Sequence, residues 1–309
     1  MLIRISTSFP AWPLVRQTPG GRGFWGDHQF VVDQPVEACD WWVVIDGLER
    51  PETARCSREN TLLITGEPPA IKSYDRRFTK QFAHVVTCHR RLRHTAKRLT
   101  QQALPWHIGV VRGERGETAA HFLYDDFTEP VAMEKREAIS VIVSDKAITR
   151  GHRHRLKLIE KLTQHFGETL EVYGRGFQEV DDKWDVIAPV RYHLVLENSR
   201  VPHYFTEKLS DAFLGGAFPV YSGCPNLEEY FPSSSYLAVD SSDIRGTIRS
   251  IEALLSGQVE FRALEALDSA RRLVLDHYNL FPMLVDFIRS KPLGQPRELT
   301  LQPQGIPAP

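Results

Sequence analysis

Charged side chains in the stretch from Glu197 to Gly223 have the types and spacing of an anion site. Glu207 and Lys208 follow Thr206 at the start of a predicted helix. The unpaired N–H groups and the macrodipole of a helix N-terminus already favour an anion. A lysine there makes sense mainly if a more negative group, such as a phosphate, lies opposite it. The alternative is an N-capped helix with a solvated Lys208, and helix physics alone leaves both interpretations open.

Polar residues before that helix extend the same rim. Glu197 and Asn198 end a predicted strand, so they and the first turn of the helix should lie along one edge of a domain. We expect Thr206, or the loop before it, to cap the helix. Lys208 would neutralise a diphosphate, and Glu207 would accept hydrogen bonds from sugar hydroxyls.

The elements that must hold this rim predict a doubly wound α/β domain. Residues 138–145 and 169–176 have the apolar character of strands, and the apolar residues between Leu158 and Phe166 repeat at helical spacing. This order makes a βαβ unit with parallel strands. Further strands are expected at 192–198, 218–223 and 236–240, with helices beginning near Thr206, Leu227 and Ser242. In an open parallel sheet, ligands bind beyond the carboxyl ends of the strands.

The first half of the chain predicts a second domain. Short apolar runs at 2–6, 41–48, 61–67 and 84–89 are typical of buried strands. Periodicity is lost over 112–135, so we expect an N-terminal α/β domain at 1–137 and a C-terminal domain at 138–291. Long amphipathic helices are expected over 259–291, interrupted near Pro282. The proline-rich segment 292–309 is predicted to be disordered.

Composition and charge limit the possible functions. The chain has 309 residues, 42% of them hydrophobic, which is enough for a large core and two domains. Its formal net charge of -1 gives no global attraction to nucleic acid, so a nucleic-acid partner is disfavoured. The four cysteines form no CxxC pair and favour the reducing cytosol. Neither a signal peptide nor an apolar run long enough to span a bilayer is expected.

The string ENSRVPHYFTEKLSDAFLGGAFPVYSGCPNLEEYFPSSSYLAVD, residues 197–240, resembles the signature of the α-1,3/4-fucosyltransferases of glycosyltransferase family 10. The shared pattern is ENS, six residues, TEK, a short helix, and a small-residue pair before PV. Further similarities are weaker. They include Arg155 at a helix start, Arg175 within VYGRG, and the ITGEPP segment of the first half.

The resemblance implies a GT-B type enzyme, with two Rossmann-like domains that face a cleft. The C-terminal domain would hold GDP-β-L-fucose and the N-terminal domain a saccharide acceptor. By position, Lys208 and Arg175 would bind the donor diphosphate, and Glu207 the ribose hydroxyls. Tyr204 and Asn198 would line the nucleotide pocket.

Arg155 is a further donor-binding candidate, and no metal cofactor is expected. Positioned cations can stabilise the charge that builds on the departing GDP without a metal. The acidic pairs Asp125-Asp126 and Asp181-Asp182 do not follow a strand in a D-x-D arrangement, so they are interpreted as solvated loop charges.

Inverting transfer also needs a base that takes the proton from the acceptor hydroxyl. Glu67 is the candidate, because it ends a predicted strand and Pro68 behind it favours an extended backbone. A solvated turn carboxylate is the alternative. Glu197 is a second candidate, although its place in an apolar strand favours a structural role. His107 is expected to line the acceptor cleft.

These observations predict a cytoplasmic fucosyltransferase that is metal-independent and inverting. It would act on a saccharide acceptor, and a lipid-linked acceptor would bring it to the inner membrane face. Two alternatives stay open: a GT-B enzyme that uses another sugar nucleotide, and an inactive relative that binds a nucleotide or glycan.

Overall fold

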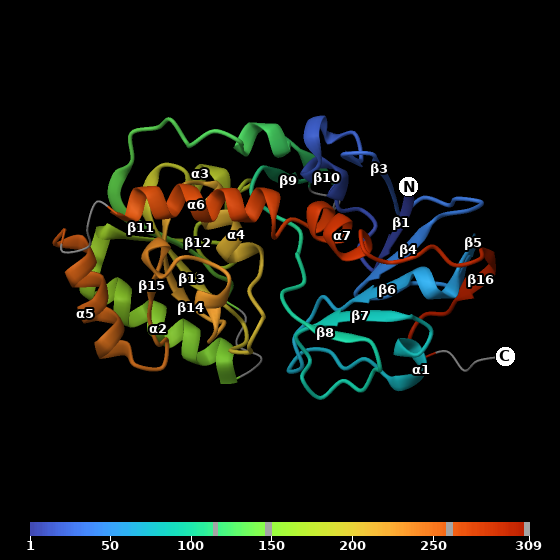
Figure 1. The fold of residues 1–309 in the computed structure, drawn as a ribbon. Coiled ribbons are helices and arrows are strands. Elements are labelled where there is room, and N and C mark those ends of the chain that lie inside the picture. The colour runs from blue at the N-terminus through green and yellow to red at the C-terminus, as the bar shows by residue number, and fades with distance from the viewer. Residues whose placement is uncertain (114–116, 146–149, 258–261, 306–309) are drawn as a thin grey trace. The chain divides into compact units, whose positions relative to one another are not determined.

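The computed structural model describes residues 1–113, 117–145, 150–257 and 262–305. The chain divides into two compact units (Figure 1). Unit 1 comprises Met1–Leu104 and Tyr278–Pro309, and unit 2 comprises Pro105–His277. Each unit is built on a sheet whose strands are mainly parallel. The predicted α/β class, with one Rossmann-like domain in each unit, is therefore confirmed.

The main sheet of unit 1 has the order β2-β3-β1-β4-β6-β7-β8 among the described residues. Only β2 and β3 pair in antiparallel fashion; the other neighbours are parallel. The strands are β1 (Leu2–Thr7), β2 (Phe24–Trp25), β3 (His28–Val32), β4 (Trp41–Ile45), β6 (Thr61–Ile64), β7 (His84–Thr87) and β8 (Lys97–Leu99). All five residues of β4 are buried, as expected for a central strand covered on both faces.

Short helices and the C-terminal segment complete unit 1. The core on one face of the sheet includes Phe30 and Phe281, whose rings lie 4.9 Å apart edge to face. On the other face, Trp42 belongs to a second cluster that includes Phe78. The remaining elements are η1 (Leu14–Gln17), η2 (Pro19–Gly21), β5 (Glu52–Cys56), η3 (Arg58–Asn60), α1 (Arg76–Thr79), α7 (Leu280–Ile288) and β16 (Arg297–Leu301).

Unit 2 contains a parallel sheet in the order β12-β11-β13-β14-β15 among the described residues. These strands are β11 (Arg136–Ile142), β12 (Leu170–Tyr173), β13 (Val190–Leu196), β14 (Phe218–Ser222) and β15 (Leu237–Ala238). The main helices are α2 (Arg150–Phe166), α3 (Trp184–Ile187), α4 (Glu207–Leu214), α5 (Ile244–Leu255) and α6 (Arg262–Asp276). The smaller elements are β9 (Val110–Arg112), β10 (Thr118–Ala120), η4 (Tyr124–Phe127), η5 (Gly167–Thr169), η6 (Leu227–Glu229) and η7 (Ser233–Ser235).

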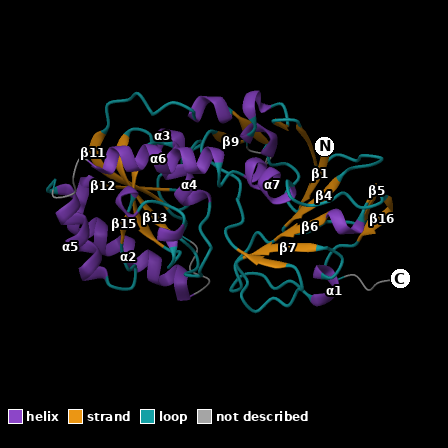
Figure 2. Ribbon diagram, in the orientation of Figure 1, coloured by secondary structure: helices purple, strands orange, loops and turns teal. Residues whose placement is uncertain are grey.

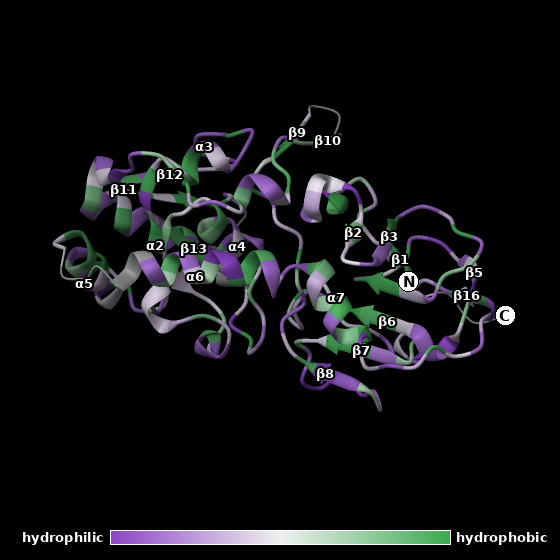
Figure 3. Ribbon diagram, turned by 45° about the horizontal axis from the view of Figure 1, so that its top comes forward, coloured by the Kyte–Doolittle hydropathy of each residue, from purple (hydrophilic) through white to green (hydrophobic). Residues whose placement is uncertain are grey.

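Helices cover both faces of the unit 2 sheet (Figure 2). Apolar side chains of α2 and α5 share one core with the strands, including Leu158 and Ile251. On the other face α3 and α4 contact β13, and α6 packs on α4. Figure 3 shows hydrophobic residues concentrated in central strands such as β1 and β6, whereas α6 alternates between hydrophobic and hydrophilic residues.

Among the described helices, none combines the length and apolar character needed to cross a membrane.

The predicted domain boundary near residue 137 is wrong. Residues 105–135 belong to unit 2, although their sequence lacks periodicity. Polar contacts attach them to that unit: Asp182 Oδ1 accepts from the Gly109 amide at 2.8 Å, and the Arg271 guanidinium donates to the carbonyl of Phe127. Long-range contacts of this kind leave no mark on local composition.

The C-terminal predictions also need correction. Within 292–309, predicted to be disordered, Arg297–Leu301 forms β16 and pairs with β5 of unit 1; residues 306–309 lie outside the described residues. The expected long helices exist as α6 and α7, but the break falls before Asn279, which caps α7 by accepting from the Phe281 amide. Pro282 is tolerated inside the first turn of α7, where backbone N–H groups have no helical partner. The helix expected near Leu227 is only the 3-10 turn η6.

Candidate donor-binding site

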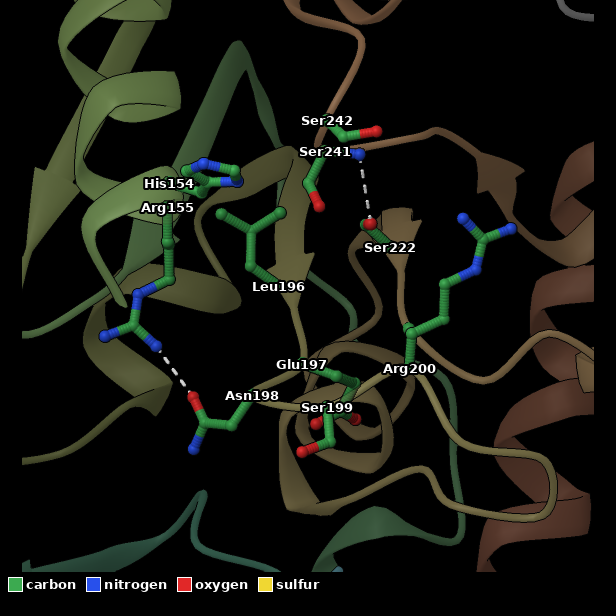
Figure 4. A pocket seen from close by; sticks show the side chains of 11 residues that line it. His154, Arg155, Leu196, Glu197, Asn198, Ser199, Arg200, Ser222, Ser241 and Ser242 are labelled. Atoms are coloured by element: carbon green, nitrogen blue, oxygen red, sulfur yellow. Dashed lines mark hydrogen bonds between the residues drawn. The ribbon is translucent and has the colours of Figure 1, made fainter. Parts of the chain in front are cut away.

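A pocket of ≈ 170 Å³ lies at the carboxyl edge of the unit 2 sheet (Figure 4). Strands β13 and β14 end here, and the pocket also takes residues from α2 and from the loop before α5. It is lined by His154, Arg155, Leu196, Glu197, Asn198, Ser199, Arg200, Ser222, Gly223, Ser241 and Ser242. This is the edge at which open parallel sheets bind ligands. The rim expected from Glu197 and Asn198 is thus part of a real concavity.

Arg155 and Asn198 form the polar wall of this pocket. Arg155 Nη1 donates to Asn198 Oδ1 at 2.7 Å, a contact drawn in Figure 4. The buried Nε of Arg155 has no hydrogen-bond partner within the described part of the chain. The guanidinium group carries a positive charge, so a charge-assisted hydrogen bond from Arg155 would stabilise an anionic oxygen in the pocket. Arg155 and Asn198, two of the predicted donor-binding residues, are therefore neighbours on the wall of this pocket.

Small residues at the end of β14 shape the opposite wall. Ser222 Oγ accepts from the Ser241 amide at 3.2 Å, which ties the loop before α5 to the strand. At Gly223, an added Cβ would lie 2.4 Å from both Glu197 Cγ and the Tyr221 hydroxyl. Only glycine leaves room for those side chains. The hydroxyl groups of this wall can hydrogen-bond a polar ligand in either direction.

The first turn of α4 lies beside the pocket and is organised by Glu197. The Glu197 side chain is fully buried and accepts from both the amide and the hydroxyl of Thr206, each at 2.8 Å. Thr206 in turn caps α4 by accepting from the Lys208 amide at 3.3 Å, which confirms the predicted cap. Glu197 therefore has the structural hydrogen-bonding role that its apolar strand suggested.

Lys208 lies among oxygens of the chain itself. Its ammonium is 3.0 Å from Glu207 Oε1, 3.2 Å from Thr206 Oγ1 and 3.8 Å from Glu197 Oε2. Burial alone would lower the pKa of Lys208, but the two carboxylates outweigh it and raise that pKa. Burial raises the pKa of Glu197, whereas Lys208 holds the pKa of Glu207 well below its usual range. Lys208, which was predicted to face an anionic ligand, is therefore bound by two carboxylates of the chain itself.

A second charged pair extends this cluster. Lys183 Nζ lies 2.6 Å from Asp211 Oδ2, on the buried face of α4, and 4.0 Å from Glu207 Oε1. Asp211 Oδ1 also accepts from the amides of His107 and Ile108, at 2.9 and 3.1 Å. Asp211 thus fixes the segment after residue 104 on α4.

His107 belongs to unit 2 and not to the first domain, in which the predicted boundary had placed it. Burial lowers the pKa of His107 to about 4, with Glu207 acting in the opposite direction. The imidazole is therefore neutral at pH 7. Its predicted contact with the acceptor stays a prediction.

Arg175 and Tyr204 do not line the pocket. Arg175 is exposed on the loop after β12, where its carbonyl accepts from the Asp145 amide at 3.0 Å. Gly174 before it has a φ of +110°, and a Cβ there would lie 2.1 Å from the Val143 carbonyl oxygen, so glycine is required. Tyr204 is 4% exposed and packs inside the unit. Their contacts with a donor stay predictions.

Glu67, the predicted base, lies at the carboxyl edge of the unit 1 sheet. It follows β6, and its side chain is exposed. The Glu67 amide donates to the Tyr74 hydroxyl at 3.3 Å, and its carbonyl accepts from His89 Nε2 at 2.7 Å. The backbone of Glu67 is thus held by hydrogen bonds at both its amide and its carbonyl group.

The acidic pairs also have defined places. Asp182 is buried, contrary to the expectation of a solvated loop charge, because its carboxylate accepts from the amides of Gly109 and Trp184. Asp126 accepts from the Leu123 amide at 2.7 Å in an exposed turn. Within the described ranges, no group of three or more His, Cys, Asp or Glu side chains is arranged to hold a metal ion.

Several residues of the site were not predicted. Ser222, Ser241 and Ser242 have a detectable signal, because Ser222 lies at the end of one predicted strand and Ser241 and Ser242 follow the next, at the same edge of the sheet. His154 and Arg200 carry no such signal. Lys183 and Asp211 are 28 positions apart, and only the fold brings them together.

Part of unit 2 is similar in sequence to a known protein family. Residues 132–261 match the family described as "Glycosyltransferase family 10 (fucosyltransferase) C-term". The mouse protein "4-galactosyl-N-acetylglucosaminide 3-alpha-L-fucosyltransferase 9" is 40% identical over 76 residues, which cover 23% of this chain and 21% of that protein. The bovine "Alpha-(1,3)-fucosyltransferase 4" is 37% identical over 93 residues, which cover 28% of this chain and 23% of that protein.

A solved structure described as "Crystal Structure of alpha1,3-Fucosyltransferase" is similar over 94% of this chain and 91% of that chain, with 14% identity and a TM-score of 0.49. The sequence matches to the curated relatives span less than a quarter of those proteins. The motif ENS to TEK and the pocket beside it both lie inside the matched segment. Residues 132–261 are therefore similar to the C-terminal domain of glycosyltransferase family 10.

Proposed function

We propose that the protein is an inverting fucosyltransferase that moves L-fucose from GDP-β-L-fucose to a hydroxyl group of a saccharide. The observation that carries the proposal is the pocket at the carboxyl edge of unit 2, with Arg155 and Asn198 on its wall, inside the segment that matches family 10. The positive charge of Arg155 on this wall favours an anionic ligand oxygen in the pocket.

Unit 2 is the proposed donor domain. Arg155 and Asn198 would bind the nucleotide, together with Tyr204. Lys208 and Arg175 would bind the diphosphate, and Glu207 would accept hydrogen bonds from ribose hydroxyls. Charge that develops on the departing GDP would be stabilised by these cations, so the proposed reaction requires no metal. Lys208 can serve in this way because Glu207 and Glu197 keep it charged.

Glu67 of unit 1 is the proposed general base. In a single displacement the acceptor oxygen forms a bond to the anomeric carbon of fucose, and the bond from that carbon to the GDP oxygen breaks. The acceptor proton goes to the Glu67 carboxylate, and the configuration at the anomeric carbon inverts. His107 is retained as a proposed acceptor contact. A cytoplasmic location and membrane contact through a lipid-linked acceptor stay predictions from the sequence.

The proposal is tested by measuring fucose transfer from GDP-fucose to a 4-galactosyl-N-acetylglucosaminide, in EDTA and in Mg²⁺. We expect turnover that does not depend on the metal. Glu67→Gln should lower turnover by about 10²- to 10⁴-fold, the usual contribution of a general base, while GDP binding is kept. Glu49→Gln, another exposed carboxylate of unit 1, is the control.

Several outcomes would count against the proposal. Transfer from a different sugar nucleotide would assign another donor to the same fold. GDP binding with no transfer to any saccharide would indicate an inactive relative. Full activity of Glu67→Gln would remove Glu67 as the base.

A further inference from the structure

The turn that presents Glu67 is held by a buried polar network. Strands β4 and β6 are parallel neighbours, with Ile45 paired to Ile64, so Asp46 and the Gly66-Glu67 turn emerge at the same edge. Tyr74 is only 9% exposed, and its side chain lies between Asp46 and the Gly66-Glu67 turn. Its hydroxyl accepts from the amides of Gly66 and Glu67, at 3.1 and 3.3 Å.

Asp46 sets the direction of the Tyr74 hydroxyl. The single proton of Tyr74 is donated to Asp46 Oδ1, so the lone pairs of the hydroxyl oxygen are available to the two amides. Asp46 Oδ2 accepts from Ser8 Oγ and Lys72 Nζ, each at 2.9 Å. Burial alone would raise the pKa of Asp46, but hydrogen bonds from Tyr74 and Lys72 hold it below its usual value. The carboxylate therefore stays ionised as an acceptor.

The other side of the turn is fixed as well. His89 Nε2 donates to the Glu67 carbonyl at 2.7 Å, and the His89 ring packs edge to face on Tyr74 with centroids 5.1 Å apart. At Gly66 a Cβ would lie 3.0 Å from Asp46 Cβ and Oδ1, so the approach of Asp46 to the turn favours glycine there. The backbone of Glu67 is bonded through both its amide and its carbonyl, while its side chain is exposed.

We propose that Tyr74, oriented by Asp46, is a positioning residue that fixes the Gly66-Glu67 turn and thereby aims the Glu67 carboxylate at the acceptor hydroxyl. This inference rests on the proposed function, because it assigns Glu67 the role of base. Burying an ionised aspartate and a tyrosine hydroxyl costs free energy. The presence of both groups beneath the backbone of Glu67 therefore indicates that the position of the exposed Glu67 carboxylate matters for function. A base that is misplaced by about 1 Å loses about 10²-fold in rate.

Tyr74→Phe tests this proposal because it removes only the hydroxyl. We expect kcat to fall by about 10- to 100-fold while the acceptor KM and the GDP Kd change much less. In a Glu67→Gln background the same change should have less than about a twofold further effect, because the two residues would act as one unit. Tyr124→Phe is the matched control, since it also removes a hydroxyl bonded to a carboxylate, that of Asp276.

Amide hydrogen exchange provides a readout that does not depend on turnover. Tyr74→Phe should speed exchange at the Gly66 and Glu67 amides by at least about tenfold, with little change in β7. If Tyr74→Phe does not fold, Asp46→Gly should show the same pattern, because it removes the acceptor of the Tyr74 proton and glycine tolerates the φ of 66° found at Asp46.

The outcomes separate this proposal from the proposed function. If wild-type protein does not transfer fucose, the proposed function fails and the positioning role is overturned with it, whatever the exchange result. If wild-type protein is active but Tyr74→Phe keeps full kcat, or loses the same factor with and without Glu67, the positioning role alone is overturned. Unchanged exchange at Gly66 and Glu67 would likewise overturn it.

Discussion

Lys208 illustrates how one residue can satisfy two requirements. A cation in the first turn of a helix opposes the macrodipole, and the structure compensates it with Glu207 and Glu197. The same charge would bind a diphosphate in the proposed reaction. The buried Glu197 carboxylate accounts for the lysine without any ligand, so the sequence argument for a phosphate at Lys208 is weaker than the argument from the pocket.

Lys208→Ala is expected to weaken GDP binding by about 1.5 to 3 kcal/mol, the usual contribution of a hydrogen bond to a charged group. It should also lower the free energy of unfolding, because Glu197 loses its neighbouring cation. Calorimetry well below the unfolding midpoint separates the two effects. Lys161→Ala, an exposed lysine on α2, is the control. Unchanged GDP affinity in Lys208→Ala would remove Lys208 from the donor site.

At the scale of single residues, the sequence located the rim that follows a strand, because Asn198 lies on the pocket wall and Thr206 caps α4. Arg155 was assigned by resemblance, and it contacts Asn198 in the pocket. Arg175 and Tyr204 were assigned by resemblance only, and the pocket does not include them. No local signal places Lys183 beside Asp211, because that contact depends on how α3 and α4 pack on the sheet.

Among the elements, β11 and β13 carry a buried polar pair within the sheet. Ser140 and His193 lie on these neighbouring strands, with the serine hydroxyl 2.7 Å from His193 Nδ1. Burial lowers the pKa of His193 to about 3. The unfolded chain therefore binds a proton below pH 6.5 that the folded chain excludes. The stability that this difference gives is present at neutral pH and is lost as the pH falls from 6.5 toward 3.

His193→Gln should reduce the acid sensitivity of unit 2. Between pH 7.5 and pH 5, the buried histidine accounts for about 2 kcal/mol of lost stability, and the variant should lack that loss. Denaturant unfolding at the two pH values measures it, with the exposed His121→Gln as control. The variant will be less stable at both pH values. A pH dependence equal to that of the wild-type protein would contradict the assignment of His193 as buried and neutral.

Strands were easier to predict than helices because buried parallel strands are continuous apolar runs. The predicted runs at 41–48, 61–67 and 84–89 contain β4, β6 and β7. The segment after Leu227 is apolar enough to suggest a helix, but Pro225 and Pro232 restrict its length to the turn η6. Asn279 outweighs Pro282 as the boundary between α6 and α7, because its side chain caps α7.

At the scale of the whole molecule, the chain leaves unit 1 at Leu104 and returns to it at Tyr278. The alternation of apolar runs predicts the α/β class of both units. It does not predict where the units begin and end in the sequence, because this depends on contacts such as that of β16 with β5, which join positions more than 200 residues apart. The low local hydrophobicity of the C-terminal segment predicts disorder, whereas in the structure β16 is held by backbone pairing with β5.

The central claim is that the pocket of unit 2 binds a guanosine diphosphate. The most direct measurement is calorimetric titration of the full chain with GDP, UDP, dTDP and CMP, first in EDTA and then in Mg²⁺. We predict that GDP binds at least about tenfold more tightly than the others, a difference of about 1.4 kcal/mol, and that its affinity is the same with and without the metal. A preference for another nucleotide, binding that requires Mg²⁺, or no binding at all would contradict the claim.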